Sequence, residues 1–232
     1  MLILIRNEII FSLLSEKTNH QALAYDIITT TFAAGNEYTA GKDEKRLDEE
    51  RRKMNQTKTL VALSLLVGIG AVLHLAIPGI IFNIKPDMML TMMFLGIVFF
   101  PTKKNVLLLG VVTGVISGLT TNFPGGLLPN MIDKPLTAFI FFSLFLMIKE
   151  RFNTITGVAL LTSVGTIISG AIFLTSALVI VGLPASILLL FSTVVLPATL
   201  INTITILIIY PVMKTVLKHT GFMKQQLNKK SA

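Results

Sequence analysis

This sequence of 232 residues contains neither cysteine nor tryptophan. The lack of cysteine excludes disulfide bonds, thiolate nucleophiles and cysteine-ligated metal sites. Histidine is also scarce, and His20, His74 and His219 are too far apart in the sequence to suggest a metal cluster. The sequence therefore predicts no metal and no other cofactor.

Charged residues are also scarce. Only 14% of the residues are charged, 53% are hydrophobic, and the mean hydropathy is +0.77. Ordinary soluble domains carry about 25% charged residues. Acidic residues are especially rare beyond residue 53, where Asp87, Asp133 and Glu150 are the only three. The composition excludes an ordinary soluble domain and indicates a membrane protein.

The chain has two unlike parts. Residues 1–53 carry a net charge of −1, whereas residues 54–232 carry +9 and nearly all the long apolar runs. We expect residues 1–53 to be a poorly structured extension in which residues 42–53 form a solvated helix or are disordered. The codons GAG-AGG-AGG for Glu50-Arg51-Arg52 would make a ribosome-binding sequence before Met54, which predicts that translation starts there. Residues 54–232 then form the membrane domain.

Six apolar segments follow residue 53, and crossing a bilayer takes about 20 residues. They cover residues 59–82, 88–100, 105–121, 135–148, 154–181 and 185–213. The second and fourth, with 13 and 14 residues, are short for a full span, so five full crossings are the alternative to six.

The basic residues indicate how these segments are oriented. With six crossings and both termini inside, ten of the twelve lysines and arginines of residues 54–232 lie on the inner side, and Lys85 and Lys134 lie on the outer side. Cytoplasmic loops carry such an excess of positive charge. The sequence therefore predicts an all-α, polytopic bundle of about six transmembrane helices, surrounded by the lipids of the plasma membrane, with both termini cytoplasmic. This distribution also argues against nucleic-acid binding, which needs basic residues gathered on a surface facing water.

Candidate binding residues concentrate in the second outer connection. Prolines and glycines break the helical pattern there, and such backbone survives near a membrane only where protein buries it or water reaches it. We expect an outer loop that ends when Pro135 opens the fourth helix as its first residue. The candidates in this connection are Asn122, Phe123, Gly125, Gly126, Asn130, Asp133 and Lys134. A solvated loop is the structural alternative, but the scarcity of ionisable groups favours a binding site.

The first outer connection repeats this pairing of charges. Lys85 and Asp87 flank a proline, and Asp87 could equally act only as the N-cap of the second helix. A zwitterionic ligand would be served by a carboxylate facing its ammonium and a lysine facing its carboxylate. Both connections supply such a pair, and we favour Asp133 over Asp87 as the carboxylate.

Polar residues within the apolar segments complete the candidates. His74 and Asn202 either line a cavity or hydrogen-bond neighbouring helices. Pro197 lacks the N–H that would pair with the Thr193 carbonyl, which predicts a kink near Asn202. Two stripes of small residues predict close helix packing: Gly110, Gly114 and Gly118, and Thr162, Thr166 and Gly170. No hydrolase elbow, zincin histidine pair or phosphate loop is present, so the sequence does not indicate an enzyme.

Several ordered motifs resemble the tryptophan transporter family of Gram-positive bacteria. They are Lys85-Pro-Asp-Met-Met-Leu-Thr-Met-Met-Phe-Leu-Gly96, Lys103-Lys-Asn-Val-Leu-Leu-Leu-Gly110, Asn122-Phe-Pro-Gly-Gly126 and Pro129-Asn-Met-Ile-Asp-Lys-Pro135. The resemblance covers residues 56–222. More distantly, the chain is similar to the substrate-binding components of energy-coupling factor transporters, by analogy of fold alone.

The resemblance implies uptake of L-tryptophan across the plasma membrane. Its indole would lie near Phe123 and Met88, and transport would be energised by proton movement through Asp133 or His74, or by a separate ATPase module. The absence of tryptophan would suit a protein needed during tryptophan starvation. Two alternatives stay open: a vitamin-binding component of an energy-coupling factor transporter, and a non-transporting membrane structural or assembly protein.

Overall fold

The computed structural model describes residues 30, 42, 46–76, 87–148 and 154–219. Within these residues the secondary structure is helical, without strands, which confirms the predicted all-α class. The chain divides into two units, Met1–Lys58 and Thr59–Ala232. In the first unit, residues 46–58 are helical and almost all exposed, and Arg46 Nε lies 3.5 Å from Glu50 Oε1. Residues 46–53 thus form the solvated helix that was one of the two alternatives.

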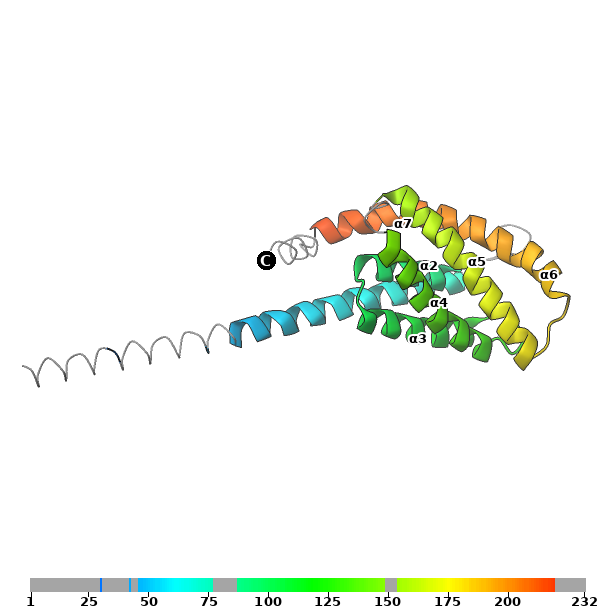
Figure 1. Ribbon diagram of the computed structural model, residues 1–232, viewed down its shortest axis with the longest axis horizontal. Helices are drawn as coiled ribbons and strands as arrows, with labels where there is room; N and C mark the ends of the chain where they lie inside the picture. Colours follow the sequence, from blue (N-terminus) through cyan, green and yellow to red (C-terminus); the bar gives the residue numbers. More distant parts are fainter. Residues whose placement is uncertain (1–29, 31–41, 43–45, 77–86, 149–153, 220–232) are drawn as a thin grey trace, which may run out of the picture. The chain divides into compact units, whose positions relative to one another are not determined.

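The second unit is a bundle of apolar helices (Figure 1). The helix Arg46–Ala76 contributes its residues 59–76, and α2 (Met88–Phe99), α3 (Lys103–Thr120), α4 (Leu127–Ile148) and α5 (Ile155–Ile180) follow. The short α6 (Ile187–Leu190), the π-helix η1 (Phe191–Val195) and α7 (Leu196–His219) run on without a break. Among the described residues, five helices are long and apolar enough to cross a membrane, and α2 is a shorter sixth. The polytopic bundle is therefore confirmed.

The short helix α2 lies in the core of the bundle. At 1.5 Å per residue its 12 residues extend about 18 Å, well short of the roughly 30 Å of a bilayer core. Ten of these residues are buried, and Phe94 stacks on Phe141 of α4 with ring centroids 3.9 Å apart. The methionines of α2 belong to this buried set.

The start of α4 corrects the sequence analysis. We expected an outer loop as far as Lys134 and a helix opening at Pro135, but α4 begins at Leu127 and contains Pro135 in its interior. The helix continues because Asp133 and Lys134 are paired inside the bundle and need no water. A proline inside a membrane helix is tolerated where neighbouring groups satisfy the backbone. The fourth helix therefore has 22 residues, enough for a full span.

The glycine stripe of α3 explains how α4 is held at this place. A Cβ atom at Gly110 would lie 2.9 Å from the Pro135 Cα atom, and one at Gly118 would lie 2.8 Å from the Leu127 carbonyl oxygen. Side chains at these positions would push the two backbones apart, so the stripe permits the close packing that the sequence predicted.

The boundaries of the other helices differ less from the predicted segments. The fifth segment is confirmed to within a residue, and the last helix continues six residues further than predicted, to His219. Residues 77–82 of the first segment lie outside the described residues.

Candidate functional site

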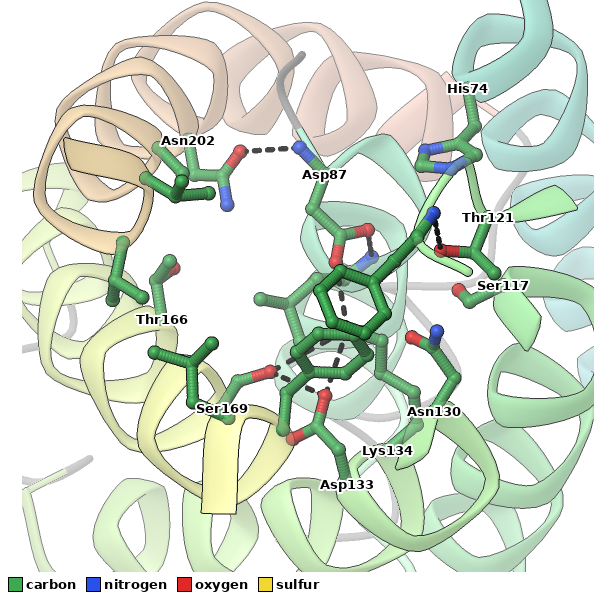
Figure 2. Close-up of a pocket in the computed structure, with 18 of the residues that line it drawn as sticks. His74, Asp87, Ser117, Thr121, Asn130, Asp133, Lys134, Thr166, Ser169 and Asn202 are labelled. Atoms are coloured by element: carbon green, nitrogen blue, oxygen red, sulfur yellow. Dashed lines mark hydrogen bonds and ion pairs between the residues drawn. The ribbon is translucent and has the colours of Figure 1, made fainter. Parts of the chain in front are cut away.

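A cavity of about 520 Å³ lies within the second unit, lined by residues of the helix Arg46–Ala76 and of each element from α2 to α7 (Figure 2). Small-molecule sites in proteins typically have volumes of about 300 to 1,000 Å³. The polar lining residues are His74, Asp87, Ser117, Thr120, Thr121, Asn122, Asn130, Asp133, Lys134, Thr166, Ser169 and Asn202. The apolar lining residues are Leu90, Phe123, Gly170, Phe173, Leu174, Leu190, Val194, Val195 and Ala198. The cavity therefore has the size and the mixed lining of a site for a small amphipathic molecule.

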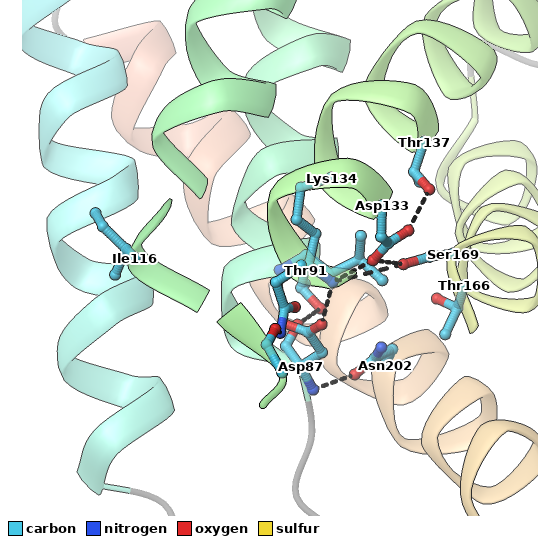
Figure 3. Close-up of polar contacts among 12 residues, drawn as sticks. Asp87, Thr91, Ile116, Asp133, Lys134, Thr137, Thr166, Ser169 and Asn202 are labelled. Carbon is cyan, nitrogen blue, oxygen red and sulfur yellow. Dashed lines mark hydrogen bonds and ion pairs between the residues drawn. The ribbon is translucent and has the colours of Figure 1, made fainter. Parts of the chain in front are cut away.

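One lysine joins two carboxylates at this cavity. Lys134 Nζ lies 2.7 Å from Asp87 Oδ2 and 3.0 Å from Asp133 Oδ2 (Figure 3). The side chains of Lys134 and Asp133 are 3% and 0% exposed, so this ion-pair cluster is buried inside an apolar bundle. Two carboxylates and one ammonium leave a formal charge of −1. A cationic group entering the cavity would balance that charge.

Asp133 is held from several sides. Its Oδ1 accepts a hydrogen bond from Thr137 Oγ1 at 2.7 Å, and its Oδ2 accepts one from Ser169 Oγ at 2.8 Å in addition to the contact with Lys134. The carboxylate is thus fully buried and bonded within α4 and to α5. This geometry fixes the position of Lys134.

Asp87 is held less completely and lies closer to the open space. It is the N-cap of α2, because its Oδ1 accepts from the Leu90 N–H at 2.9 Å. Its own N–H donates to Asn202 Oδ1 at 2.9 Å, which joins α2 to α7. The Asp87 side chain is 28% exposed; its Oδ1 accepts from the Leu90 N–H and its Oδ2 from Lys134 Nζ, where a carboxylate oxygen can accept two hydrogen bonds. Asp87 can therefore accept another donor without losing its present ones.

Two buried polar atoms at the cavity have no partner among the described residues. They are Asn202 Nδ2, in a side chain that is 0% exposed, and Ser117 Oγ, in one that is 3% exposed. Figure 2 shows them on opposite walls of the cavity. Leaving a buried donor or acceptor unsatisfied costs about 1 to 3 kcal/mol. A bound molecule would remove that cost.

An aromatic pair forms part of the apolar lining. Phe123 and Phe173 meet edge to face, with ring centroids 5.4 Å apart and ring planes at 82°. The Phe123 N–H donates to Thr121 Oγ1 at 3.2 Å, which ties the first ring to the residue that follows α3. Edge-to-face packing is a favourable arrangement of aromatic rings, so this wall suits a further ring.

The cavity brings together most of the residues that the sequence indicated. His74, Asp87, Asn122, Phe123, Asn130, Asp133, Lys134 and Asn202 all line it. Gly125 and Gly126 do not line it and instead shape the turn before α4, where Gly125 has a φ of 71° and the Gly126 carbonyl oxygen accepts from Asn130 Nδ2. Met88 is buried and is not among the lining residues, and Lys85 lies outside the described residues.

Sequence reasoning missed the hydroxyl groups of Ser117 and Ser169 and the aromatic ring of Phe173. Ser117 and Ser169 are ordinary small residues of apolar helices, and nothing in their spacing distinguishes them. Thr166 and Gly170 were assigned only to helix packing, yet they also line the cavity. The residues before Pro197 form the π-helix η1, whose Val194 and Val195 line the cavity as well, while the kink expected near Asn202 stays a prediction. Such π-helical turns occur frequently at functional sites.

These features define a class of protein. Apolar helices that enclose a cavity of ligand size, with a buried ion-pair cluster facing it, are typical of a membrane transport protein. Within the described residues no group of three histidine, aspartate or glutamate side chains could hold a metal ion.

Comparison with known proteins identifies the family. Residues 56–218 match the family described as "Tryptophan transporter TrpP", and the chain belongs to that family. It is thus a membrane transporter rather than an enzyme.

Curated relatives agree with this assignment. The chain is 54% identical over 169 residues to a "Probable tryptophan transport protein" of Bacillus subtilis, which covers 73% of this chain and 98% of the relative. A protein with the same description in Clostridium acetobutylicum is 45% identical over 157 residues, covering 68% of this chain and 92% of the relative. Another in Clostridium perfringens is 36% identical, covering 73% and 98%. No solved structure matches the chain significantly.

Proposed function

We propose that the chain takes up L-tryptophan across the bacterial plasma membrane and that the cavity described above is its binding site. The family and the descriptions of three relatives support the substrate. The observation that carries the assignment to the cavity is its lining, which combines a surplus carboxylate, an unpaired amide donor and an aromatic pair. A zwitterionic aromatic amino acid needs these three kinds of partner.

The ammonium group of the substrate binds Asp87 in this proposal. Asp133 was our first choice from the sequence, but its two oxygens are already bonded to three side chains and it is 0% exposed. Asp87 is more exposed and has acceptor capacity left. The substrate ammonium would share Asp87 with Lys134 and balance the formal negative charge of the cluster.

The carboxylate of the substrate binds Asn202 Nδ2, the unpaired donor on α7. Asn202 Oδ1 already accepts from the Asp87 N–H at 2.9 Å, so the two proposed partners are neighbours. An amino acid carries its ammonium and carboxylate on one carbon atom and requires neighbouring partners. The indole ring then lies against Phe123 and Phe173, which form the apolar end of the site.

We further propose that the cavity opens toward the outside and that both termini are cytoplasmic. The lining includes Asp87 and Leu90 at the start of α2, residues from the first two turns of α4, and the last turn of α3. Charge counting places these helix ends on the outer side. Lys103 and Lys104, at the opposite end of α3, and Lys214 and Lys218, near the end of α7, are inner residues in the same count. The cavity and the basic residues thus occupy opposite ends of the helices.

Single cysteines test this orientation cleanly because the chain has none of its own. Ser186 is an exposed residue before α6, and Lys104 is an exposed residue at the start of α3. A membrane-impermeant maleimide should label Ser186→Cys in intact cells and label Lys104→Cys only after the cells are opened. Labelling of Lys104→Cys in intact cells would contradict the proposed orientation.

Uptake tests the proposed function itself. Transport-deficient bacterial cells that express the full chain should accumulate labelled L-tryptophan saturably. Excess unlabelled tryptophan should block this uptake, and tyrosine, phenylalanine and thiamine should compete weakly. Cells with empty vector set the baseline, and protein in the membrane is verified by immunoblot. If thiamine blocked this uptake more strongly than the amino acids do, the result would support a vitamin carrier instead. If cells with verified protein in the membrane took up no labelled L-tryptophan, the result would contradict the proposal.

The same cells distinguish the two energy sources. Loss of uptake on adding a protonophore while cellular ATP is maintained would indicate proton coupling. A requirement for co-expressed ATPase subunits would indicate a separate energising module.

A further inference from the structure

Ser117 is a polar residue of the cavity to which neither the fold nor the proposed function gives a role. Its side chain is 3% exposed, it lines the cavity, and its Oγ atom has no hydrogen-bond partner among the described residues. Hydroxyl groups on membrane helices usually bond a carbonyl oxygen one turn earlier, as Thr120 does to Ile116 at 2.7 Å. Ser117 makes no such hydrogen bond, so its hydroxyl group is available to a bound molecule.

The position of Ser117 places it at the aromatic end of the site. It lies in the last turn of α3, one helical turn before Thr121. Thr121 Oγ1 accepts from the Phe123 N–H, and the Phe123 ring packs on Phe173. Figure 2 shows Asn202, the partner proposed for the carboxylate, across the cavity from Ser117, and Asp87, which donates to Asn202 Oδ1, between the two. The hydroxyl group therefore faces the side chain of the substrate.

We propose that Ser117 Oγ accepts a hydrogen bond from the indole N–H and thereby determines the specificity for tryptophan. This inference rests on the proposed function. The indole ring carries one polar hydrogen, which can only donate, and a serine oxygen has lone pairs to accept it. At this wall of the cavity the indole N–H would supply the partner that Ser117 Oγ lacks among the described residues.

The consequence is discrimination against rings of the same shape that lack the N–H. A site built to bond an N–H rejects an analogue without it, because the protein group is then left unpaired. 3-Benzothienyl-L-alanine has a sulfur atom in place of the indole N–H and nearly the same size. We expect the wild-type protein to bind it about 10- to 100-fold more weakly than L-tryptophan.

Competition binding to the purified full chain tests this inference. Labelled L-tryptophan is displaced by unlabelled L-tryptophan or by 3-benzothienyl-L-alanine, and the ratio of the two affinities is measured. Ser117→Ala should remove the preference for L-tryptophan or reverse it, because the indole N–H then has no acceptor and the sulfur analogue has no N–H to leave unpaired. Thr113→Val is the matched control, since Thr113 lies one turn earlier on α3 with another buried hydroxyl lacking a partner among the described residues, but does not line the cavity. It should keep the wild-type ratio.

The outcomes separate this inference from the proposed function. If wild-type protein binds L-tryptophan and 3-benzothienyl-L-alanine equally, the role of Ser117 is overturned while tryptophan binding stands. If Ser117→Ala keeps the wild-type ratio, the role of Ser117 is overturned as well. If wild-type protein does not bind L-tryptophan at all, the proposed function fails first. The wild-type comparison needs no variant, so the test holds even if Ser117→Ala is poorly folded.

Discussion

Asp87→Asn is expected to weaken L-tryptophan binding about 100-fold, because the substrate ammonium loses its charged acceptor. A hydrogen bond to a charged group contributes about 1.5 to 3 kcal/mol, and 2.7 kcal/mol corresponds to 100-fold. The substitution is structurally mild. Asparagine is as good an N-cap as aspartate, so the bond to the Leu90 N–H and the start of α2 should remain. Equilibrium binding of labelled L-tryptophan to purified protein measures the change.

A ligand without an ammonium group is the control for this variant. Indole-3-propionate retains the ring and the carboxylate, so it should bind weakly and about equally to wild-type protein and to Asp87→Asn. If Asp87→Asn lowered the affinity for both ligands by the same factor, the substitution would be acting on the whole cavity, and Asp87 would not be the partner of the ammonium.

Lys134→Met should cause a large loss of stability, about 3 to 5 kcal/mol. The substitution leaves the carboxylate of Asp133 fully buried beside Asp87 with no counter-charge, and breaking a buried pair from one side has a cost of this size. The fraction of protein that stays monodisperse after heating in detergent measures the effect. Lys104→Met is the matched control, because Lys104 is an exposed lysine at the start of α3 and should be replaceable.

A second substitution should restore most of that stability. In Lys134→Met with Asp133→Asn the buried charge at position 133 is removed together with its partner, and amide groups can still bond Thr137 and Ser169. The double variant is therefore expected to be more stable than Lys134→Met alone. A double variant as unstable as the single one would show that Lys134 stabilises the bundle through its packing and not through its charge.

The sequence predicted the apolar architecture well where its signals were local. Asp87 caps α2 as predicted, and α5 begins and ends within a residue of the predicted apolar segment. The predicted start of α4 was wrong because Asp133, Lys134 and Pro135, taken without the rest of the fold, are typical of a loop. Their partners Asp87 and Ser169 lie 47 and 35 residues from Lys134 along the chain, and only the fold brings them together.

The candidate site shows the same division. Scarce ionisable and amide residues such as His74, Asp87 and Asn202 could be selected because each is unusual in an apolar segment. Ser117 and Ser169 could not be selected, since serine is common in membrane helices and usually bonds its own backbone. Their significance depends on which hydroxyl has a partner and which has none. That is a property of the assembled bundle.

Ligand fluorescence is the most direct test of the central claim that this cavity binds L-tryptophan. The chain has no tryptophan of its own, so light absorbed by indole but not by tyrosine excites only the ligand. Purified protein titrated into L-tryptophan should shift the emission to shorter wavelength, saturably and at one ligand per chain, as the ring enters an apolar site. Asp87→Asn should need about 100-fold more protein for the same shift. An emission unchanged by folded wild-type protein, or a shift equal in the two proteins, would contradict the account.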